Sequence, residues 1–172
     1  VPVDLIHREL DELQRRRAAG EIVVSVFGEI STGKSSLIRA LLPGTEIAVD
    51  VRGGTTREVS YYTWTSSAGD RLILADLPGL NEADGSLDQL ARDEALRAHV
   101  VIYVCEGDLT RDQYAALRTL IDLGCPLIVA LNKIDRYTDR ELNLVRERLA
   151  ERIGEQLEVA PVQCGGFEEV TR

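Results

Sequence analysis

The stretch that decides the fold is 22–42, which reads IVVSVFGEISTGKSSLIRALL. Its first part, Ile22–Phe27, is an apolar, β-branched run typical of a strand that is buried on both faces. Its last part, Lys34–Leu42, has the composition of a helix. Between them, Gly28–Ser35 fits the pattern GxxxxGK(S/T) in full. A loop of this kind surrounds phosphate groups with backbone N–H groups and the positive end of a helix, so the stretch predicts a nucleoside triphosphate site.

The residues of this loop have separate expected roles. Gly28 and Gly33 permit backbone shapes and close approaches that a Cβ would block. Lys34 should reach the β- and γ-phosphates, and Ser35 should ligate Mg²⁺. Further contacts with the nucleotide are expected from Glu29, Ser31, Thr32 and Ser36.

Outward from this loop, strand-like and helix-like segments alternate along the chain. Such alternation predicts a three-layer α/β fold around a mostly parallel sheet of about six strands. A turn at Ser66–Asp70 would make Glu58–Ala75 a hairpin, with one antiparallel strand at an edge, and the Gly-rich segment 43–56 is expected to be a loop. The expected strands are Ile22–Phe27, Glu58–Thr65, Arg71–Ala75, His99–Cys105, Pro126–Leu131 and Val159–Gln163. The expected helices are Lys34–Leu42, Leu87–Ala98, Thr110–Leu123 and Thr138–Ile153.

The first 20 residues read as an extension ahead of one domain at 21–172. Leu5, Ile6, Leu10 and Leu13 make one apolar stripe, which predicts an amphipathic helix over 3–18. The chain contains no Met and stops soon after its last motif, so we expect a fragment of a longer protein that lacks the last helix of the domain.

Composition excludes several classes of function. A net charge of −9 argues against direct nucleic-acid binding by this domain, because that binding needs a basic face. No run of 18 apolar residues occurs, so a membrane link is expected only through regions outside these residues. The three cysteines are widely spaced and form no zinc pattern, which predicts free thiols in a reducing cytoplasm.

Two segments between the loop and the centre of the chain predict contacts with Mg²⁺ and the γ-phosphate. Asp76, at the end of a predicted strand, can hold Mg²⁺, and the N–H of Gly79 can contact the γ-phosphate. A threonine hydroxyl in the preceding loop can complete the shell of the ion when a γ-phosphate is present. Thr56 is the expected residue and Thr55 is its near-equal rival.

A second motif, Asn132–Asp135, follows the strand that ends at Leu131 and predicts a guanine site. Asp135 can accept hydrogen bonds from N1–H and the 2-amino group of guanine, a donor pair that adenine lacks. The stem of Lys133 can lie along the ring, and Asn132 can bond N7 and brace the phosphate loop. After the last strand, Cys164–Gly165 is where a backbone N–H could meet O6.

Together these residues resemble the TRAFAC class of P-loop GTPases, most of all its Era/TrmE-like and dynamin-like members. The motifs that carry the resemblance are Gly28–Ser35, Thr56, Asp76–Gly79, Asn132–Asp135 and Cys164–Gly165. The resemblance implies a G domain that binds GTP or GDP with Mg²⁺, and it gives Lys34, Thr56, Gly79 and Ser31 catalytic roles. The last motif reads Gln-Cys-Gly in place of the usual Ser-Ala-Lys or Ser-Ala-Leu.

Two positions refine the expected mechanism. Leu80 stands where Ras-like members carry the glutamine that orients the attacking water. Ser31 stands where similar proteins place an Asn or Ser that helps to bind a monovalent cation, so K⁺ or Na⁺ is a candidate second ion. With no Gln and no obvious arginine finger, we expect slow basal turnover; Arg52 and Arg57 are more simply read as solvated.

Four functions compete as explanations of these residues. The leading one is a GTP-hydrolysing conformational switch. The alternatives are a GTP-dependent homodimerisation or assembly module of a larger dynamin-like or membrane-associated protein, and a nucleotide-binding scaffold that barely hydrolyses. An ATPase or small-molecule kinase conflicts with Asn132–Asp135.

Overall fold

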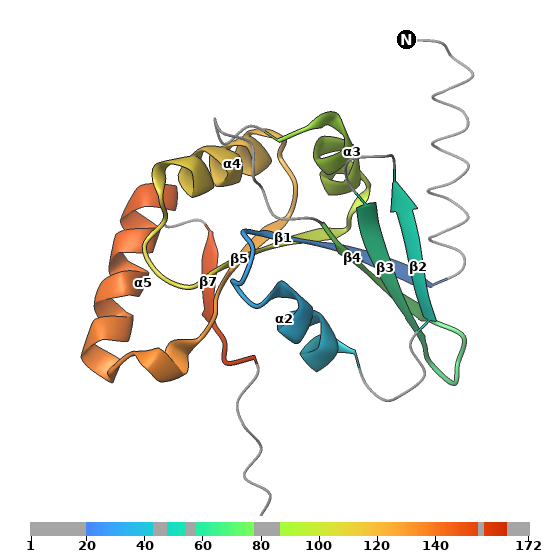
Figure 1. The fold of residues 1–172 in the computed structure, drawn as a ribbon, viewed down its shortest axis with the longest axis horizontal. Helices are drawn as coiled ribbons and strands as arrows, with labels where there is room; N and C mark the ends of the chain where they lie inside the picture. The colour runs from blue at the N-terminus through green and yellow to red at the C-terminus, as the bar shows by residue number, and fades with distance from the viewer. Residues whose placement is uncertain (1–19, 43–47, 54–57, 78–86, 155–156, 165–172) are drawn as a thin grey trace, which may run out of the picture.

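The computed structural model describes residues 20–42, 48–53, 58–77, 87–154 and 157–164 (Figure 1). They form one seven-stranded sheet in the order β2-β3-β4-β1-β5-β6-β7. The predicted three-layer α/β fold with a mostly parallel sheet is thereby confirmed, with seven strands instead of about six. The strands are β1 Glu21–Gly28, β2 Ala48–Gly53, β3 Glu58–Thr65, β4 Arg71–Asp76, β5 Val100–Cys105, β6 Leu127–Leu131 and β7 Glu158–Pro161.

The sheet grows outward from β1, which pairs in parallel with β4 on one side and β5 on the other. Strands β6 and β7 continue the parallel half. On the other half, β3 is antiparallel to both β4 and β2. The central position of β1 explains why Val26 and Phe27 are fully buried although they point to opposite faces.

The helices cover both faces of the sheet. They are α2 Lys34–Leu41, α3 Gln89–Arg97, α4 Arg111–Asp122 and α5 Asp139–Ile153, with a short 3₁₀ turn η1 at Ile134–Arg136. Among these helices, α2 lies by itself on one face, where Ile38 packs with Val26 and Leu74. Helices α3, α4 and α5 share the core on the other face, where Leu117 and Leu149 pack in the same cluster as Phe27. Two hydrophobic cores therefore enclose the sheet, one on each face.

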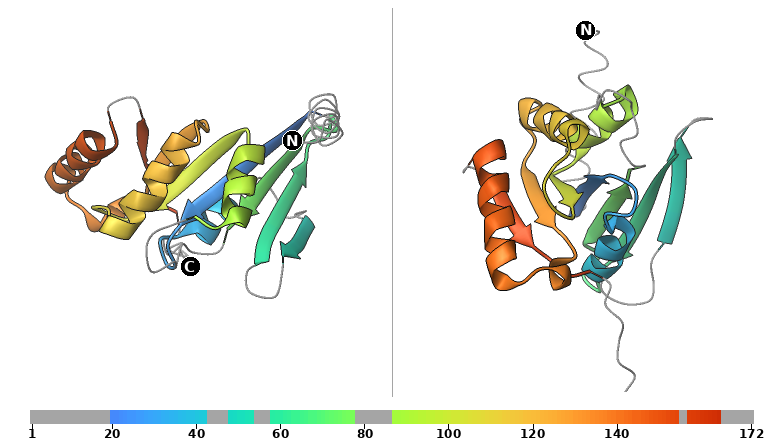
Figure 2. Two further views of the ribbon diagram at one scale, coloured as in Figure 1. Left: turned by 90° about the horizontal axis from the view of Figure 1, so that it is seen from above. Right: turned by 60° about the vertical axis from the view of Figure 1, so that its left-hand side comes forward.

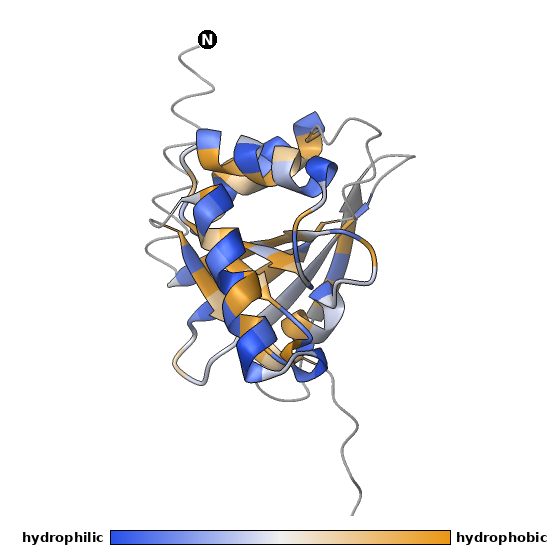
Figure 3. Ribbon diagram, turned by 90° about the vertical axis from the view of Figure 1, so that its left-hand side faces the viewer, coloured by the Kyte–Doolittle hydropathy of each residue, from blue (hydrophilic) through white to orange (hydrophobic). Residues whose placement is uncertain are grey.

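Sequence features of α4 and α5 explain where these helices begin. The side chains of Thr110 and Thr138 each accept a hydrogen bond from a backbone N–H in the first turn of a helix. In turn, the side chains of Gln113 and Glu141 accept a hydrogen bond from the backbone N–H of the capping threonine. Figure 3 shows α5 facing the viewer with hydrophilic and hydrophobic residues interleaved along it, as expected for a helix with one face on a core. None of the helices in the described part of the chain is long and apolar enough to span a bilayer.

The predicted elements agree with the structure within two residues at each end, with one exception. The sequence predicts a loop over 43–56, but Ala48–Gly53 forms β2 at the edge of the sheet, antiparallel to β3. The edge strand is therefore β2, and the antiparallel strand β3 lies between β2 and β4. Figure 2 shows β2 and α5 at opposite ends of the molecule. The predicted N-terminal helix over 3–18 lies outside the described residues.

Candidate functional site

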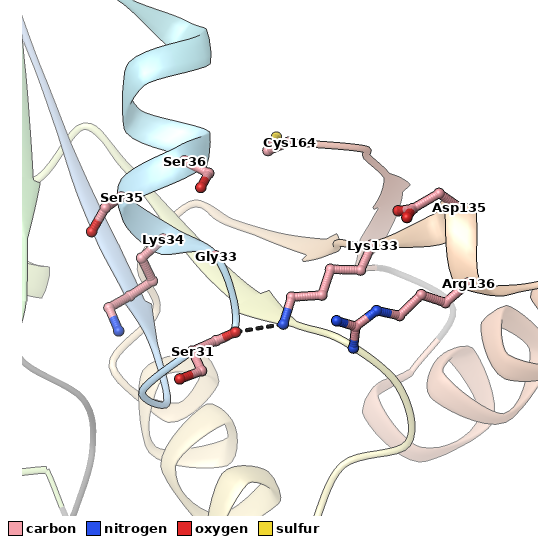
Figure 4. A pocket seen from close by; sticks show the side chains of 9 residues that line it. All are labelled: Ser31, Gly33, Lys34, Ser35, Ser36, Lys133, Asp135, Arg136 and Cys164. Atoms are coloured by element: carbon pink, nitrogen blue, oxygen red, sulfur yellow. Dashed lines mark hydrogen bonds between the residues drawn. The ribbon is translucent and has the colours of Figure 1, made fainter. Parts of the chain in front are cut away.

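The candidate site lies at the edge of the sheet where the parallel strands end. Gly28–Ser35 follows β1, Asp76 ends β4, Asn132–Asp135 follows β6 and Cys164 follows β7. Loops at this edge of an open α/β sheet are the usual place for a ligand. A pocket of about 390 Å³ opens there, lined by Ser31, Gly33, Lys34, Ser35, Ser36, Lys133, Asp135, Arg136 and Cys164 (Figure 4).

The shape of the phosphate loop depends on its two glycines. Gly28 has φ 144°, and a Cβ built on it would lie 2.4 Å from the carbonyl oxygen of Val104. Gly33 has φ 95°, and its Cβ would lie 2.1 Å from Nδ2 of Asn132. Neither position has space for a side chain. Ser31 adopts φ 69°, an uncommon conformation for a non-glycine residue, at the turn of the loop.

The side chain of Lys34 folds back over this loop. Its Nζ donates hydrogen bonds to the carbonyl oxygens of Gly28, at 2.9 Å, and Glu29, at 3.0 Å. Burial lowers the pKa of Lys34, while the nearby charges of Asp76 and Glu29 act in the opposite direction. The ammonium group is thus already placed beside the loop that would hold phosphates.

Ser35 and Asp76 bring hard oxygen ligands together where β1 and β4 end. Ser35 Oγ donates to Asp76 Oδ2 at 3.2 Å. The other oxygen, Asp76 Oδ1, is buried and has no hydrogen-bond partner among the described residues. Burial raises the pKa of Asp76, partly offset by the Lys34 charge and the Ser35 bond. A buried oxygen without such a partner beside a hydroxyl fits a site for Mg²⁺, which prefers oxygen ligands.

The side chain of Asn132 is fully buried and joins three parts of the site. Its Nδ2 donates to the carbonyl oxygen of Thr32 at 3.0 Å, and its Oδ1 accepts the backbone N–H of Cys164 at 3.0 Å. The predicted brace between this motif and the phosphate loop is therefore present. Cys164 lines the pocket, but its backbone N–H already donates to Asn132. This N–H is therefore not available to donate to O6 of a base.

Lys133 crosses from the second motif to the phosphate loop. It adopts φ 60°, and its Nζ donates to the carbonyl oxygen of Ser31 at 2.6 Å, as the dashed line in Figure 4 shows. Its stem therefore forms one wall of the pocket. Asp135 lies on the same side of the pocket, across from Lys34 and Ser35 (Figure 4). This spacing separates a phosphate end from a base end.

Two residues of the site were missed in the sequence. Arg136 lines the pocket beside Asp135, and Glu106 forms ion pairs with both Lys133 and Arg136. Both had a positional signal, because Arg136 directly follows the second motif and Glu106 directly follows β5, which ends at the same edge. The predicted roles of Thr56 (with its rival Thr55), Gly79, Leu80 and Gly165 fall outside the described residues.

Comparison with known proteins matches this chain to a family model described as 50S ribosome-binding GTPase, over residues 23–133. Translation initiation factor IF-2 of Paramagnetospirillum magneticum is 36% identical over 115 residues, which are 66% of this chain and 13% of that protein. The probable GTP-binding protein EngB of Gemmatimonas aurantiaca is 29% identical over 143 residues, covering 76% of this chain and 68% of EngB. This chain thus matches only a small part of IF-2.

Among solved structures, the fold is similar to that of a point variant of Aquifex aeolicus Era bound to GDP·AlF₄⁻. The TM-score is 0.65 at 24% identity, and the match covers 84% of this chain and 51% of the Era chain. At this identity the likeness supports the fold alone.

Proposed function

Because this chain belongs to the 50S ribosome-binding GTPase family, within the TRAFAC class of P-loop GTPases, we propose that it binds GTP with Mg²⁺, hydrolyses it to GDP and acts as a conformational switch. The observation that carries this proposal is the pocket that unites the phosphate loop with Asn132–Asp135. A phosphate loop alone would accept any nucleoside triphosphate. The hydrogen bonds of Asn132 hold the second motif at a fixed distance from the phosphate loop. A single nucleotide can then contact the loop with its phosphates and the second motif with its base.

The residues at the phosphate end bind and orient the triphosphate. Backbone N–H groups of Glu29–Ser36 and the start of α2 surround the phosphates. Lys34 supplies a positive charge, and two hydrogen bonds to carbonyl oxygens of the loop hold its ammonium group in place. Holding the phosphates in one geometry among fixed dipoles is the main contribution that a protein makes to phosphoryl transfer. Lys34 therefore has both a binding and a catalytic role in this proposal.

Ser35 and Asp76 are the described residues that would hold Mg²⁺, and Thr56 completes the set in our proposal. When bound, the ion would offset the negative charge of the phosphate groups during transfer. Asp76 must be ionised for this role. Burial raises the pKa of its carboxyl group, and the Lys34 charge and the Ser35 hydrogen bond offset part of that rise. The Ser35–Asp76 contact keeps both oxygen ligands at the same point before a nucleotide enters.

At the base end, Asp135 would accept the N1–H and 2-amino hydrogens of guanine, and the stem of Lys133, which lines the same pocket, would lie along the ring. A carboxylate that faces a base without these donors stays unpaired, which is the physical basis of selectivity. The pocket wall from Ser31 to Lys133 positions the ring between the two motifs.

We further propose slow basal turnover, because Leu80 provides no polar group to orient water. A monovalent cation near Ser31 would then assist. Single-turnover hydrolysis measured in KCl, NaCl and the salt of a bulky organic cation tests this, and equal rates in all three would contradict it. Elution volume against protein concentration, with GDP and with a transition-state mimic, tests the alternative of a GTP-dependent homodimer.

The experiment that tests guanine binding is the substitution Asp135→Asn, compared with Asp122→Asn at the far end of α4. Asp135→Asn should weaken GDP binding by on the order of a hundredfold or more and favour xanthine nucleotides. Asp122→Asn removes a carboxylate that pairs with Arg118 on the surface of α4, so it should leave both affinities unchanged. Unchanged GDP affinity in Asp135→Asn would overturn the assignment of the base site.

A further inference from the structure

Glu106 is the first residue after β5, and three residues of the turn 133–137 contact it. Its carboxylate forms an ion pair with Lys133, and Arg136 Nη1 lies 3.8 Å from the same oxygen. The hydroxyl of Tyr137 donates to its backbone carbonyl oxygen at 2.6 Å. Both the backbone and the side chain of Glu106 are therefore tied to the segment that contains Asp135.

These contacts fix Lys133 from two sides. Lys133 Nζ is shared between the carbonyl oxygen of Ser31 and the carboxylate of Glu106. The Lys133 side chain is only 21% exposed, so it is held more firmly than a typical surface lysine. A side chain that is already ordered loses less conformational entropy when a base packs against its stem.

The same carboxylate also pairs with the side chain of Arg136. Arg136 follows Asp135 in the chain, and both line the pocket. A guanidinium that meets a carboxylate can form a strong bidentate pair with it. In Figure 4, Arg136 instead extends toward the amino group of Lys133, away from the carboxylate of Asp135. Both cations pair with the same carboxylate oxygen of Glu106.

We propose that Glu106 is a positioning residue for base recognition, which holds Lys133 against the phosphate loop and keeps Arg136 from pairing with Asp135. The inference rests on the proposed binding of a guanine nucleotide. It assigns selectivity to an acid that does not touch the ligand. Without Glu106, Arg136 is free to occupy the carboxylate oxygens that guanine needs.

Simple charge arithmetic gives the opposite expectation, which makes the proposal testable. Glu106 is an acid near an anionic ligand, so its removal would strengthen nucleotide binding if its charge alone mattered. The positioning role instead predicts weaker binding and poorer discrimination between bases. The direction of the change therefore separates the two roles.

The test is Glu106→Gln, with dissociation rates of fluorescent GDP and the affinity ratio of GDP to IDP as the two measurements. IDP lacks the 2-amino group, which in GDP would donate a hydrogen bond to Asp135, so the ratio reports on the use of Asp135. Glu106→Gln should release GDP roughly three- to tenfold faster and lower the ratio by a similar factor, since an exposed pair contributes modestly. Adding Arg136→Gln to this variant should restore the ratio.

Asp108→Asn is the matched control. Asp108 lies two residues further along, is similarly exposed and pairs with Arg148 at 3.1 Å, outside the pocket. It should behave as wild type in both measurements. The side chain of Glu106 is 43% exposed, so its substitution should leave the unfolding temperature unchanged.

Each outcome has one meaning. If the wild-type chain shows no preference for GDP over IDP and ADP, the proposed function fails and Glu106 is not at issue. If the wild type prefers GDP but Glu106→Gln dissociates no faster and keeps the same ratio, the positioning role is overturned. If Arg136→Gln does not restore the ratio, the part of the proposal that concerns Arg136 is wrong.

Discussion

The side-chain amide of Asn132 donates to the carbonyl oxygen of Thr32 at 3.0 Å, which links the end of β6 to the phosphate loop after β1. The two residues lie 100 positions apart in the chain, and both are buried. The same side chain accepts the N–H of Cys164 after β7. One amide thus sets the distance between the phosphate end and the base end of the pocket.

Replacing Asn132 with Ala should destabilise the protein as well as its complex with GDP. The change removes one buried and one partly buried hydrogen bond and takes the Asn132 partner from the Thr32 carbonyl and the Cys164 N–H, a cost of about 2–4 kcal/mol in the free energy of unfolding. Denaturant unfolding without nucleotide measures this cost. Asn143→Ala, on the exposed surface of α5, is the control and should stay within about 0.5 kcal/mol of wild type. Equal stabilities of the two variants would show that the Asn132 bonds do not hold the loop.

Gly33 and Gly69 form a matched pair for a second prediction. Their φ values are 95° and 94°, so alanine would be placed at the same unfavourable φ at both positions. At Gly69 a Cβ meets nothing within 4 Å among the described residues, whereas at Gly33 it would lie 2.1 Å from Asn132 Nδ2. Gly69→Ala should cost about 1–2 kcal/mol, and Gly33→Ala should cost more, because it also displaces the Asn132 side chain.

The same two variants separate strain from function. Gly69→Ala should bind GDP as wild type does, while Gly33→Ala should lose most of its affinity, measured by titration at a temperature where both remain folded. A Gly33→Ala variant with normal affinity would mean that the loop can move away from Asn132 without harm to the phosphate site.

Asp76 predicts how Mg²⁺ binding depends on pH. Burial raises the pKa of this carboxyl group, and only the ionised form can hold the cation. As the pH falls, a larger fraction is protonated than for an ordinary Asp at the same pH, so the Mg²⁺ affinity of the GDP complex should begin to decline at a higher pH than a carboxyl group with the usual pKa of about 3.9 would give. Asp76→Asn carries no titrating group there and should bind Mg²⁺ weakly, with only the pH dependence of the nucleotide itself. A wild-type curve parallel to that of Asp76→Asn would exclude Asp76 as the titrating ligand.

Most of the fold could be predicted because its elements are defined by burial. Strand β1 is covered on both faces and α4 has a capping box with an apolar face, so both have strong local patterns. Strand β2 lacks such a pattern. Its Val49 and Val51 are 58% and 51% exposed, and it is held by its ladder to β3. A strand stabilised by pairing with another strand leaves little trace in its own sequence.

The site also has parts that could be predicted from the sequence and parts that could not. Gly28–Ser35 and Asn132–Asp135 could be recognised because each motif does its work within a few consecutive residues. Glu106 had only its position directly after β5 as a signal, because its role arises where the loop after β5 meets the turn after β6. A single acid after a strand has no pattern of its own, and its partners become visible only in three dimensions.

The cysteines give a last prediction that reports directly on the pocket. Cys105 is buried, and burial raises the pKa of its thiol to about 12, so it should not react with thiol reagents in the folded protein. Cys125 and Cys164 are both half-buried, and burial raises the pKa of each. They differ in position, because Cys164 lines the pocket and Cys125 contacts the carbonyl oxygen of Ala95 at the end of α3.

GDP should therefore slow the labelling of Cys164 and leave the rate at Cys125 unchanged, as followed by mass spectrometry of peptides. ADP at the same concentration serves as the control ligand and should protect neither. Protection of both cysteines by GDP would indicate a general tightening of the fold, and protection of neither would place the nucleotide away from Cys164.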